Sequence, residues 1–401
     1  MGHAQSTEKL SLDSCLVLAE LNYPLIQQYD LLRQSKAYSL INAQKGKLPQ
    51  ISLNGQATYQ SEVTSVPGEN VPTLSKDQYQ LYGEISQPLT GITVINQQKR
   101  IIEAEAEVDR ADLETNLYAI KQRVSDLFFG ILLVEEQLKQ SALTRDDIQA
   151  GLTRADAMVK FGTSLKSSAN VLKAELMTLE QRIIEQQATR EGYMRTLALF
   201  IGRDLNQHLT LIKPQFLELS SDIRRPELHL FDSQMRVIMM QNDLLDRTNR
   251  PQLSLFLQSG VGRPALNFLS NDLEPYYIGG LRLSWNLSNF YTTKGQRQLF
   301  SINRSIVQSQ QETFLFNTNL TMTNQNTQIA KMQALIEKDR EIIALRDQII
   351  DTSKGQFENG VITSTDYKAV VIDADQARQN LVLHEIELLK LKNDYKLTSG
   401  N

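Results

Sequence analysis

The feature that most constrains the fold is a long run of heptad-spaced apolar residues in the first half of the chain. The run alternates between steps of four and three, at Leu113, Leu117, Ile120, Val124, Leu127, Ile131, Val134 and Leu138. This pattern is typical of a helix that packs along a partner helix. The helical pattern extends without proline from about Ile92 to Val159 and breaks at Gly162. A helix of roughly 70 residues would be about 100 Å long, which no small globular domain accommodates.

A strand pattern leads directly into this helix, and the same plan occurs again later in the chain. The run 77–89 alternates apolar and polar residues, as a half-buried strand does. Ile85 lies 198 residues before Leu283, and Gly162 lies 198 residues before Gly360. One offset shared by a strand, a long helix and a turn predicts an internal duplication.

Each copy is predicted to contain a helix, a strand, a loop, a strand, a long helix, a turn and a final helix. The strands begin with near-identical runs, PQISL in the first copy and PQLSL in the second. The strands and their loops are expected within 49–90 and 251–289. The helices are expected within 10–48, 91–248 and 290–397, with a linker between the copies at 208–225.

Composition excludes several functional classes. The net charge of the 401 residues is −4 and its signs are interleaved, which does not favour nucleic-acid binding. One cysteine and four scattered histidines provide no disulfide framework and no metal-ligand spacing. Without a catalytic triad pattern or a phosphate loop, we expect no enzyme, no cofactor and no metal site. No apolar run has the length of a membrane helix, and the start of the chain shows no signal-peptide pattern.

The four predicted strands have one apolar and one polar face, so they need partners. Four strands cannot close a barrel, since about eight is the practical minimum, and an open sheet leaves hydrogen-bonding edges. We therefore predict a β-barrel that is shared among subunits and whose strands pass directly into the long helices. Strands of about ten residues have the length of tilted membrane strands. Two other interpretations stay open: a soluble β-sandwich, and a soluble coiled-coil structural or tethering protein.

Several motifs resemble those of the TolC family of outer-membrane efflux proteins. They are NYPL at 22–25, RPEL at 225–228, the two strand starts, and the glycine turns KFGTSLKSSANVLKAE and FENGVITSTDYKA. The resemblance extends from Leu10 to Leu397 and implies a mixed α/β membrane protein, a homotrimer in the outer membrane of a Gram-negative bacterium. In such a trimer, long antiparallel coiled-coil helices continue the β-barrel as a closed tube that reaches into the periplasm. It implies a passive duct that docks end-on with a periplasmic adaptor and, through it, an inner-membrane transporter. The exported substrate, whether drug, metal or polypeptide, is not encoded in such motifs.

The resemblance also assigns functional residues. The adaptor-docking tip would consist of Gly162, Thr163, Ser164, Gly360, Val361, Ile362 and Thr363. The pore constriction would contain Asp366, while Ala369 replaces a second acid that many members carry. The first turn is counted as two residues longer, which leaves Asn170 in the comparable place, and Phe357 replaces a tyrosine of many members. Two purely structural explanations stay open, because glycine also ends helices and an aspartate is favoured near a helix start.

Overall fold

The computed structural model describes residues 9–64, 73–204, 210–215 and 219–401. The chain divides into two compact units, each built from segments that lie far apart in the sequence. The sheet unit contains 29–112 and 229–311, and the helical unit contains the described residues of 1–28, 113–228 and 312–401. The two longest helices, α3 (Ile92–Lys160) and α6 (Asn289–Glu358), contribute residues to both units.

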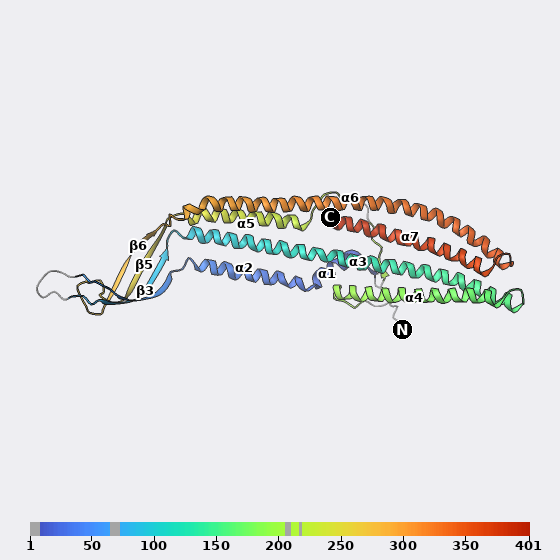
Figure 1. Ribbon diagram of the computed structural model, residues 1–401, viewed down its shortest axis with the longest axis horizontal. Helices are drawn as coiled ribbons and strands as arrows, with labels where there is room; N and C mark the ends of the chain where they lie inside the picture. Colours follow the sequence, from blue (N-terminus) through green and yellow to red (C-terminus); the bar gives the residue numbers. More distant parts are fainter. Residues whose placement is uncertain (1–8, 65–72, 205–209, 216–218) are drawn as a thin grey trace, which may run out of the picture. The chain divides into compact units, whose positions relative to one another are not determined.

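The sheet unit contains a four-stranded sheet in which every neighbouring pair of strands is antiparallel. The strand order is β2 (Gln50–Tyr59), β3 (Asp77–Pro88), β5 (Gln252–Arg263) and β6 (Glu274–Ser284). The last three of these strands are labelled in Figure 1. The four predicted strands are confirmed, and β2 and β6 form the two edges. Of the loop predicted between the first two strands, residues 65–72 lie outside the described part of the chain.

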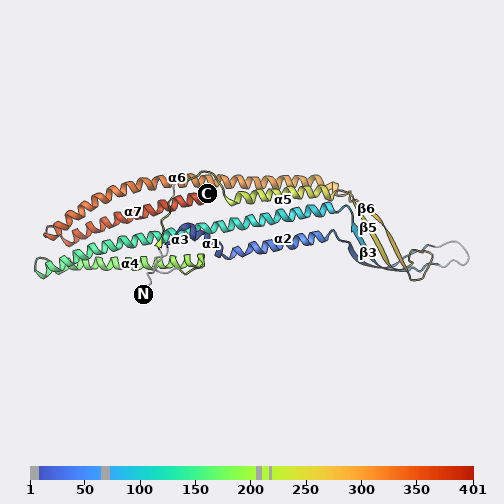
Figure 2. The same cartoon turned by 180° about the vertical axis from the view of Figure 1, so that it is seen from behind.

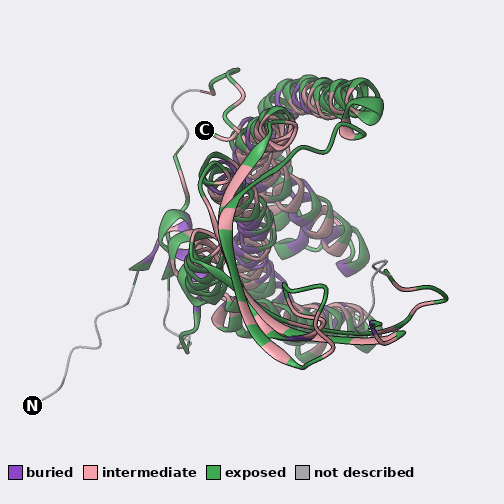
Figure 3. Cartoon of the chain, turned by 90° about the vertical axis from the view of Figure 1, so that its left-hand side faces the viewer, coloured by how far each residue is buried: buried purple, intermediate pink, exposed green. Residues whose placement is uncertain are grey.

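One face of this sheet is apolar, as the alternating sequence pattern predicts. In the strand register, Ile85 lies opposite both Ile51 and Leu257. Ile51 is 78% exposed, and Figure 3 shows the strands almost entirely in the colours of exposed and intermediate residues. The other face carries polar residues, including an ion pair in which Arg282 donates to Glu84 over 2.6 Å. An exposed apolar face of this kind marks an interaction surface.

Each strand is joined to a helix of the same unit by a short junction that hydrogen bonds hold in place. Helix α2 (Gln28–Lys45) precedes β2, α3 follows β3, α5 (Pro226–Thr248) precedes β5, and α6 follows β6. At one junction the Leu89 N–H donates to the Leu253 carbonyl (2.8 Å), and the Thr90 hydroxyl accepts from the Leu253 N–H (2.8 Å). At another, the Trp285 indole donates to the Asn249 carbonyl (3.0 Å). The predicted passage from strand into long helix is confirmed.

The helical unit consists of helices packed along one another (Figures 1 and 2). It contains α1 (Leu12–Asn22), a short 3-10 helix (Pro24–Gln27), α4 (Lys166–Ile201), α7 (Ser364–Ser399) and the second parts of α3 and α6. Of the eight predicted heptad positions in α3, six are buried and two, Leu127 and Leu138, are half-buried. The predicted packing seam is therefore confirmed. Among the described residues, no helix is long and apolar enough to cross a membrane.

Helices α4 and α7 have matching bounds. Each contains 36 residues, from Lys166 to Ile201 and from Ser364 to Ser399, so their starts and ends lie 198 residues apart. Each ends at a glycine in the left-handed conformation, Gly202 (φ 63°) and Gly400 (φ 84°), at the same offset. Glycine is favoured at this position because it has no Cβ to clash with the backbone.

The predicted linker contains local structure where it is described. Thr210–Leu211 forms the short strand β4, which pairs in parallel with β1 (Lys9–Leu10). Leu219 and Ile223 pack against a buried cluster in the helical unit, formed by Met322, Ile329 and Tyr395. Residues 208, 209 and 216–218 lie outside the described part of the chain. The described part of the linker is therefore anchored to the helical unit at Leu211, Leu219 and Ile223, while most of its other residues are exposed.

Candidate functional site

The first glycine turn connects α3 to α4 and is closed by a pair of backbone hydrogen bonds. Gly162 has φ +73°, which only glycine adopts without strain. Its N–H donates to the Val159 carbonyl (3.1 Å), and the Thr163 N–H donates to the Met158 carbonyl (2.9 Å). This combination is the Schellman motif, which satisfies the last carbonyls of a helix.

The second glycine turn, between α6 and α7, repeats the same geometry. Gly360 has φ +70°. Its N–H donates to the Phe357 carbonyl (3.1 Å), and the Val361 N–H donates to the Gln356 carbonyl (2.8 Å). In both turns a left-handed glycine ends the helix, so the structural explanation of the two glycines is confirmed. That explanation does not exclude a docking role for the same turns.

The two turns have the same length, and the predicted two-residue extension of the first turn is wrong. The N-cap of α4 is Leu165, three residues after Gly162, and the N-cap of α7 is Thr363, three residues after Gly360. Position Asp366 of α7 therefore corresponds to Ser168 of α4. The side chain of Leu165 cannot cap a helix, so the sequence does not mark where α4 begins. Asn170 lies two residues further along α4 and is exposed. It is therefore not the counterpart of Asp366, and its place in a pore constriction stays a prediction.

Helix α7 begins with a capping box that includes the predicted pore residue. The Asp366 N–H donates to the Thr363 hydroxyl (3.2 Å), while Oδ2 of Asp366 accepts from the Thr363 N–H (3.0 Å) and hydroxyl (2.6 Å). These bonds satisfy backbone donors that a helix start leaves free. The Thr363 hydroxyl, and then its N–H, hold the pKa of Asp366 below its usual value. Helix α4 lacks this device, since Leu165 provides no side-chain cap.

Most of the predicted docking residues lie at the surface. Gly162, Thr163, Gly360, Val361 and Thr363 are exposed, whereas Ser164 and Ile362 are half-buried. Three large apolar side chains of the two turns stand in solvent, with exposed fractions of 78% for Phe161, 75% for Leu165 and 70% for Val361. Exposed apolar groups that cluster in this way are typical of contact surfaces.

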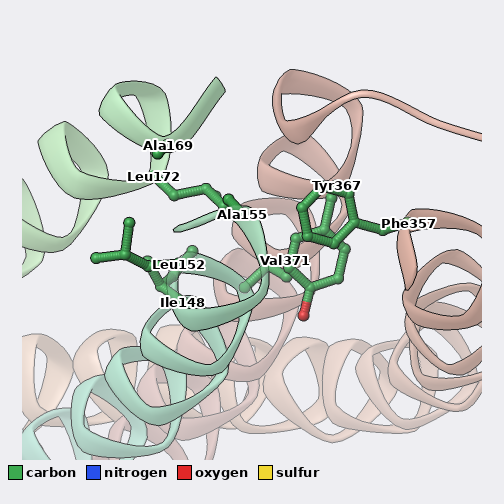
Figure 4. Close-up of a cluster of buried hydrophobic side chains, with 8 residues drawn as sticks. All are labelled: Ile148, Leu152, Ala155, Ala169, Leu172, Phe357, Tyr367 and Val371. Carbon is green, nitrogen blue, oxygen red and sulfur yellow. The ribbon is translucent and has the colours of Figure 1, made fainter. Parts of the chain in front are cut away.

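Both turns rest on one buried cluster, which is drawn in Figure 4. Helices α3, α4, α6 and α7 all contribute, through Ile148, Leu152, Ala155, Ala169, Leu172, Phe357, Tyr367 and Val371. The rings of Phe357 and Tyr367 stack with centroids 4.8 Å apart and planes 8° apart. Phe357, which the family comparison placed where many members carry tyrosine, therefore acts here through apolar packing.

Sequence reasoning missed Tyr367 and the glycine on which it packs. A Cβ at Gly151 would lie 2.7 Å from Cε1 of Tyr367, so any larger residue would displace the ring. The available signal was a glycine inside a strongly heptad-patterned helix, where glycine costs stability unless a close contact requires it.

A buried carboxylate joins three of the four helices that form this buried cluster, on the side of the cluster away from the glycine turns. Asp375 of α7 is 3% exposed and accepts from the Thr144 hydroxyl of α3 (2.7 Å) and from Arg182 of α4 (2.7 Å). Closer to the turns, Arg154 of α3 forms an ion pair with Glu358 of α6 (2.7 Å). These contacts fix the two helical hairpins to one another within the helical unit. Among the described residues, no group of His, Cys, Asp and Glu side chains could hold a metal ion.

Comparison with known proteins identifies the fold. No protein-family model and no curated protein sequence matches this chain. Its structure is similar to that of the outer membrane protein VceC from Vibrio cholerae, with a TM-score of 0.70 at 12% identity over 97% of this chain and 96% of VceC. It is similar to the outer-membrane channel OprN, with a TM-score of 0.71 at 13% identity over 97% and 90% of the two chains.

A third solved structure extends the likeness to another organism. The CmeC outer membrane channel from Campylobacter jejuni matches with a TM-score of 0.64 at 13% identity, over 96% of this chain and 83% of CmeC. All three matches cover 96% or more of this chain. The chain therefore has the fold of the TolC-type outer-membrane channels, as its sequence motifs predict.

Proposed function

We propose that this chain is the subunit of a trimeric exit duct in the outer membrane of a Gram-negative bacterium. The observation that carries this proposal is the four-stranded sheet, with an exposed apolar face and two open edges. A soluble protein would bury such a face or blunt such edges. In an outer membrane the apolar face meets lipid, as in other membrane β-proteins.

The need to close the sheet at its two edges supports a trimer. Strands β2 and β6 each have one neighbour within the chain. Pairing of β6 of one copy with β2 of the next closes a barrel from three copies and leaves no unpaired edge. In this arrangement 49–90 and 251–289 form the barrel strands and their extracellular loops. The helices of 10–48, 91–248 and 290–397 continue the barrel as a periplasmic tube.

Internal duplication supports a tube with repeated structure. The matched bounds of α4 and α7, and the capping glycines at the same 198-residue offset, support two copies of one ancestral unit. Two similar units per chain in a trimer give a wall of six similar units. A wall of repeated helical hairpins closes into a cylinder more readily than one of unlike elements.

The duct is passive and non-catalytic, and its partners supply energy. The exposed apolar residues of the two glycine turns support end-on docking with a periplasmic adaptor and, through it, an inner-membrane transporter. Drug or metal efflux and type I secretion of polypeptides both fit this arrangement. The proposal differs from a soluble coiled-coil tether in requiring a membrane.

A matched pair of substitutions on β2 tests the membrane location. Leu53 lies on the apolar face and is 76% exposed, while its neighbour Asn54 lies on the opposite face. We expect Leu53→Lys to lower the amount of trimer recovered from outer membranes, because a lysine in lipid costs about 2–4 kcal/mol near the bilayer centre. Asn54→Lys should leave it unchanged.

Chemical cross-linking in mild detergent should show three chains for the unsubstituted protein. If the protein were a water-soluble tether, Leu53→Lys would replace a leucine exposed to water and would not lower the amount of protein recovered. Equal recovery of both variants, or a stable monomer without detergent, would therefore refute the duct.

A further inference from the structure

Basic side chains gather where the strands of the sheet unit meet its helices, and the duct function alone does not account for them. In the first half of the chain, Lys45 is the last residue of α2, and Lys47 lies between α2 and β2. Lys99 and Arg100 lie in the first turns of α3, directly after β3. Lys45 and Arg100 are exposed, and the other two are half-buried.

The second half of the chain repeats this arrangement. Arg247 and Arg250 lie between the last turn of α5 and β5, and Lys294 and Arg297 lie in the first turns of α6. Arg297 forms an ion pair with Asp246. The described part of the chain offers no ion-pair partner to the other seven basic residues. Their charge is therefore directed at solvent or at a partner.

The resulting charge is strongly asymmetric along the sheet. The four junctions hold eight basic residues and one acidic residue, a net charge of +7, within 45–50, 88–100, 246–252 and 284–297. The whole chain has a net charge of −4. The described segments at the opposite end of the sheet hold two basic and four acidic residues, within 60–64, 73–77 and 263–274. We call the eight basic residues of the junctions the basic band.

Exposed aromatic residues lie in the same junctions as the basic band. The exposed fractions are 51% for Trp285, 50% for Phe290 and 88% for Tyr291. The Trp285 ring packs edge-on against Phe290, with centroids 6.2 Å apart. Aromatic side chains of this kind are enriched at the boundary between lipid tails and headgroups. Long basic side chains beside them place their charge among headgroups while their stems stay on apolar surface.

We infer that the basic band binds the headgroups of anionic phospholipids in the leaflet that faces the helices. This inference rests on the proposed outer-membrane location. Each lysine or arginine near an anionic membrane surface strengthens binding about fivefold. Seven of these cations have no ion-pair partner among the described residues, and they lie near exposed aromatic residues at one end of an apolar sheet. Such an arrangement fits the phosphate groups of a lipid surface. The acidic opposite end of the sheet lacks this complementarity.

Lipid retention by the full-length protein tests the inference. Protein purified in mild detergent is stripped of lipid and mixed with phosphatidylglycerol and phosphatidylcholine at equal mole fractions, and bound lipids are counted by native mass spectrometry. We expect phosphatidylglycerol to be retained at least tenfold more than phosphatidylcholine. The preference should fall below threefold in the triple variant Lys45→Gln, Arg250→Gln and Lys294→Gln. Raising the salt concentration should weaken it as well, because exposed charges are screened.

A matched triple variant in the helical unit provides the control. Arg123, Lys173 and Lys331 are exposed and have no ion-pair partner within the described residues, so their replacement by glutamine should leave the lipid preference unchanged. Equal retention of the two lipids, or the same loss in both triple variants, would overturn the inference. A change in ion selectivity with an unchanged lipid preference would also overturn it, by placing the band in the channel. Failure to insert into vesicles of any composition would instead refute the duct.

Discussion

Removing the carboxylate of Asp375 should loosen the helical unit beneath the glycine turns. Asp375 receives hydrogen bonds from Arg182 of α4 and Thr144 of α3, both over 2.7 Å. It therefore joins α7 to both α3 and α4 by polar contacts. We expect Asp375→Ala to raise the rate at which the backbone amides of α4 and α7 around these positions exchange with solvent.

The size of the effect follows from what each partner loses. A buried ion pair broken on one side costs about 3–5 kcal/mol, but the Arg182 side chain is 37% exposed, so water solvates part of its charge and about 2 kcal/mol remains. The single hydroxyl proton of Thr144 can turn to the Gln140 carbonyl, whose oxygen lies 3.1 Å away, so Thr144 keeps a partner and loses only about 0.5 kcal/mol. A total of about 2–3 kcal/mol corresponds to a roughly 30- to 150-fold change in local opening.

Hydrogen exchange measured by mass spectrometry on the detergent-solubilised protein gives this quantity. The control is Asp373→Ala on the same helix, whose carboxylate is 54% exposed and accepts from Arg346 over 2.8 Å. An exposed pair contributes at most about 1 kcal/mol, so exchange should change less than fivefold. Both variants gain the same helix propensity from alanine. If the two variants exchanged alike, the reasoning from burial would be wrong.

Two further predictions concern the turns. Gly162→Trp and Gly360→Trp should abolish export in complemented cells while leaving the trimer intact, because they add bulk at the proposed docking surface. The control is Gly192→Trp, since a side chain at Gly192 would also enter open space. Normal export by both turn variants would contradict docking at the turns. Asp366→Asn should lower cation preference in planar bilayers, because it removes the charge of the predicted pore residue. The Thr363 hydroxyl and N–H hold the pKa of Asp366 below its usual value, so its charged carboxylate stabilises the start of α7 at neutral pH. This contribution is lost as the pH falls from the usual value for aspartate through the lowered pKa. An unchanged cation preference in Asp366→Asn would place the constriction elsewhere.

The strands and long helices were predictable because each is long and strongly patterned. The heptad seam of α3 repeats over many turns, so a few half-buried positions such as Leu127 do not disturb it. The strand starts PQISL and PQLSL lie at the observed strand starts, Gln50 and Gln252. Periodicity reports which face of an element is buried, and in these segments the buried face is the same along the whole element.

The short and the long-range features were not predictable in this way. Strands β1 and β4 contain two residues each, too few to show any alternation, and they pair across 201 residues of sequence. The contact of Tyr367 with Gly151 joins two helices that no local pattern relates. The length of the first turn was miscounted because Leu165, an unusual N-cap residue, hides the start of α4 from a search for Ser, Thr, Asp or Asn.

Asp366 caps the start of α7, and this structural role is compatible with its predicted role in the pore. Its capping bonds use a single carboxylate oxygen, Oδ2, and the side chain remains exposed. Three like charges brought together in a trimer would raise one another's pKa, whereas the Thr363 donors lower it. The cap thus favours the charged form that a cation-selective ring requires. The matching position in α4 is Ser168, which has no charge, so each chain would contribute one carboxylate at this level and the trimer a single ring of three.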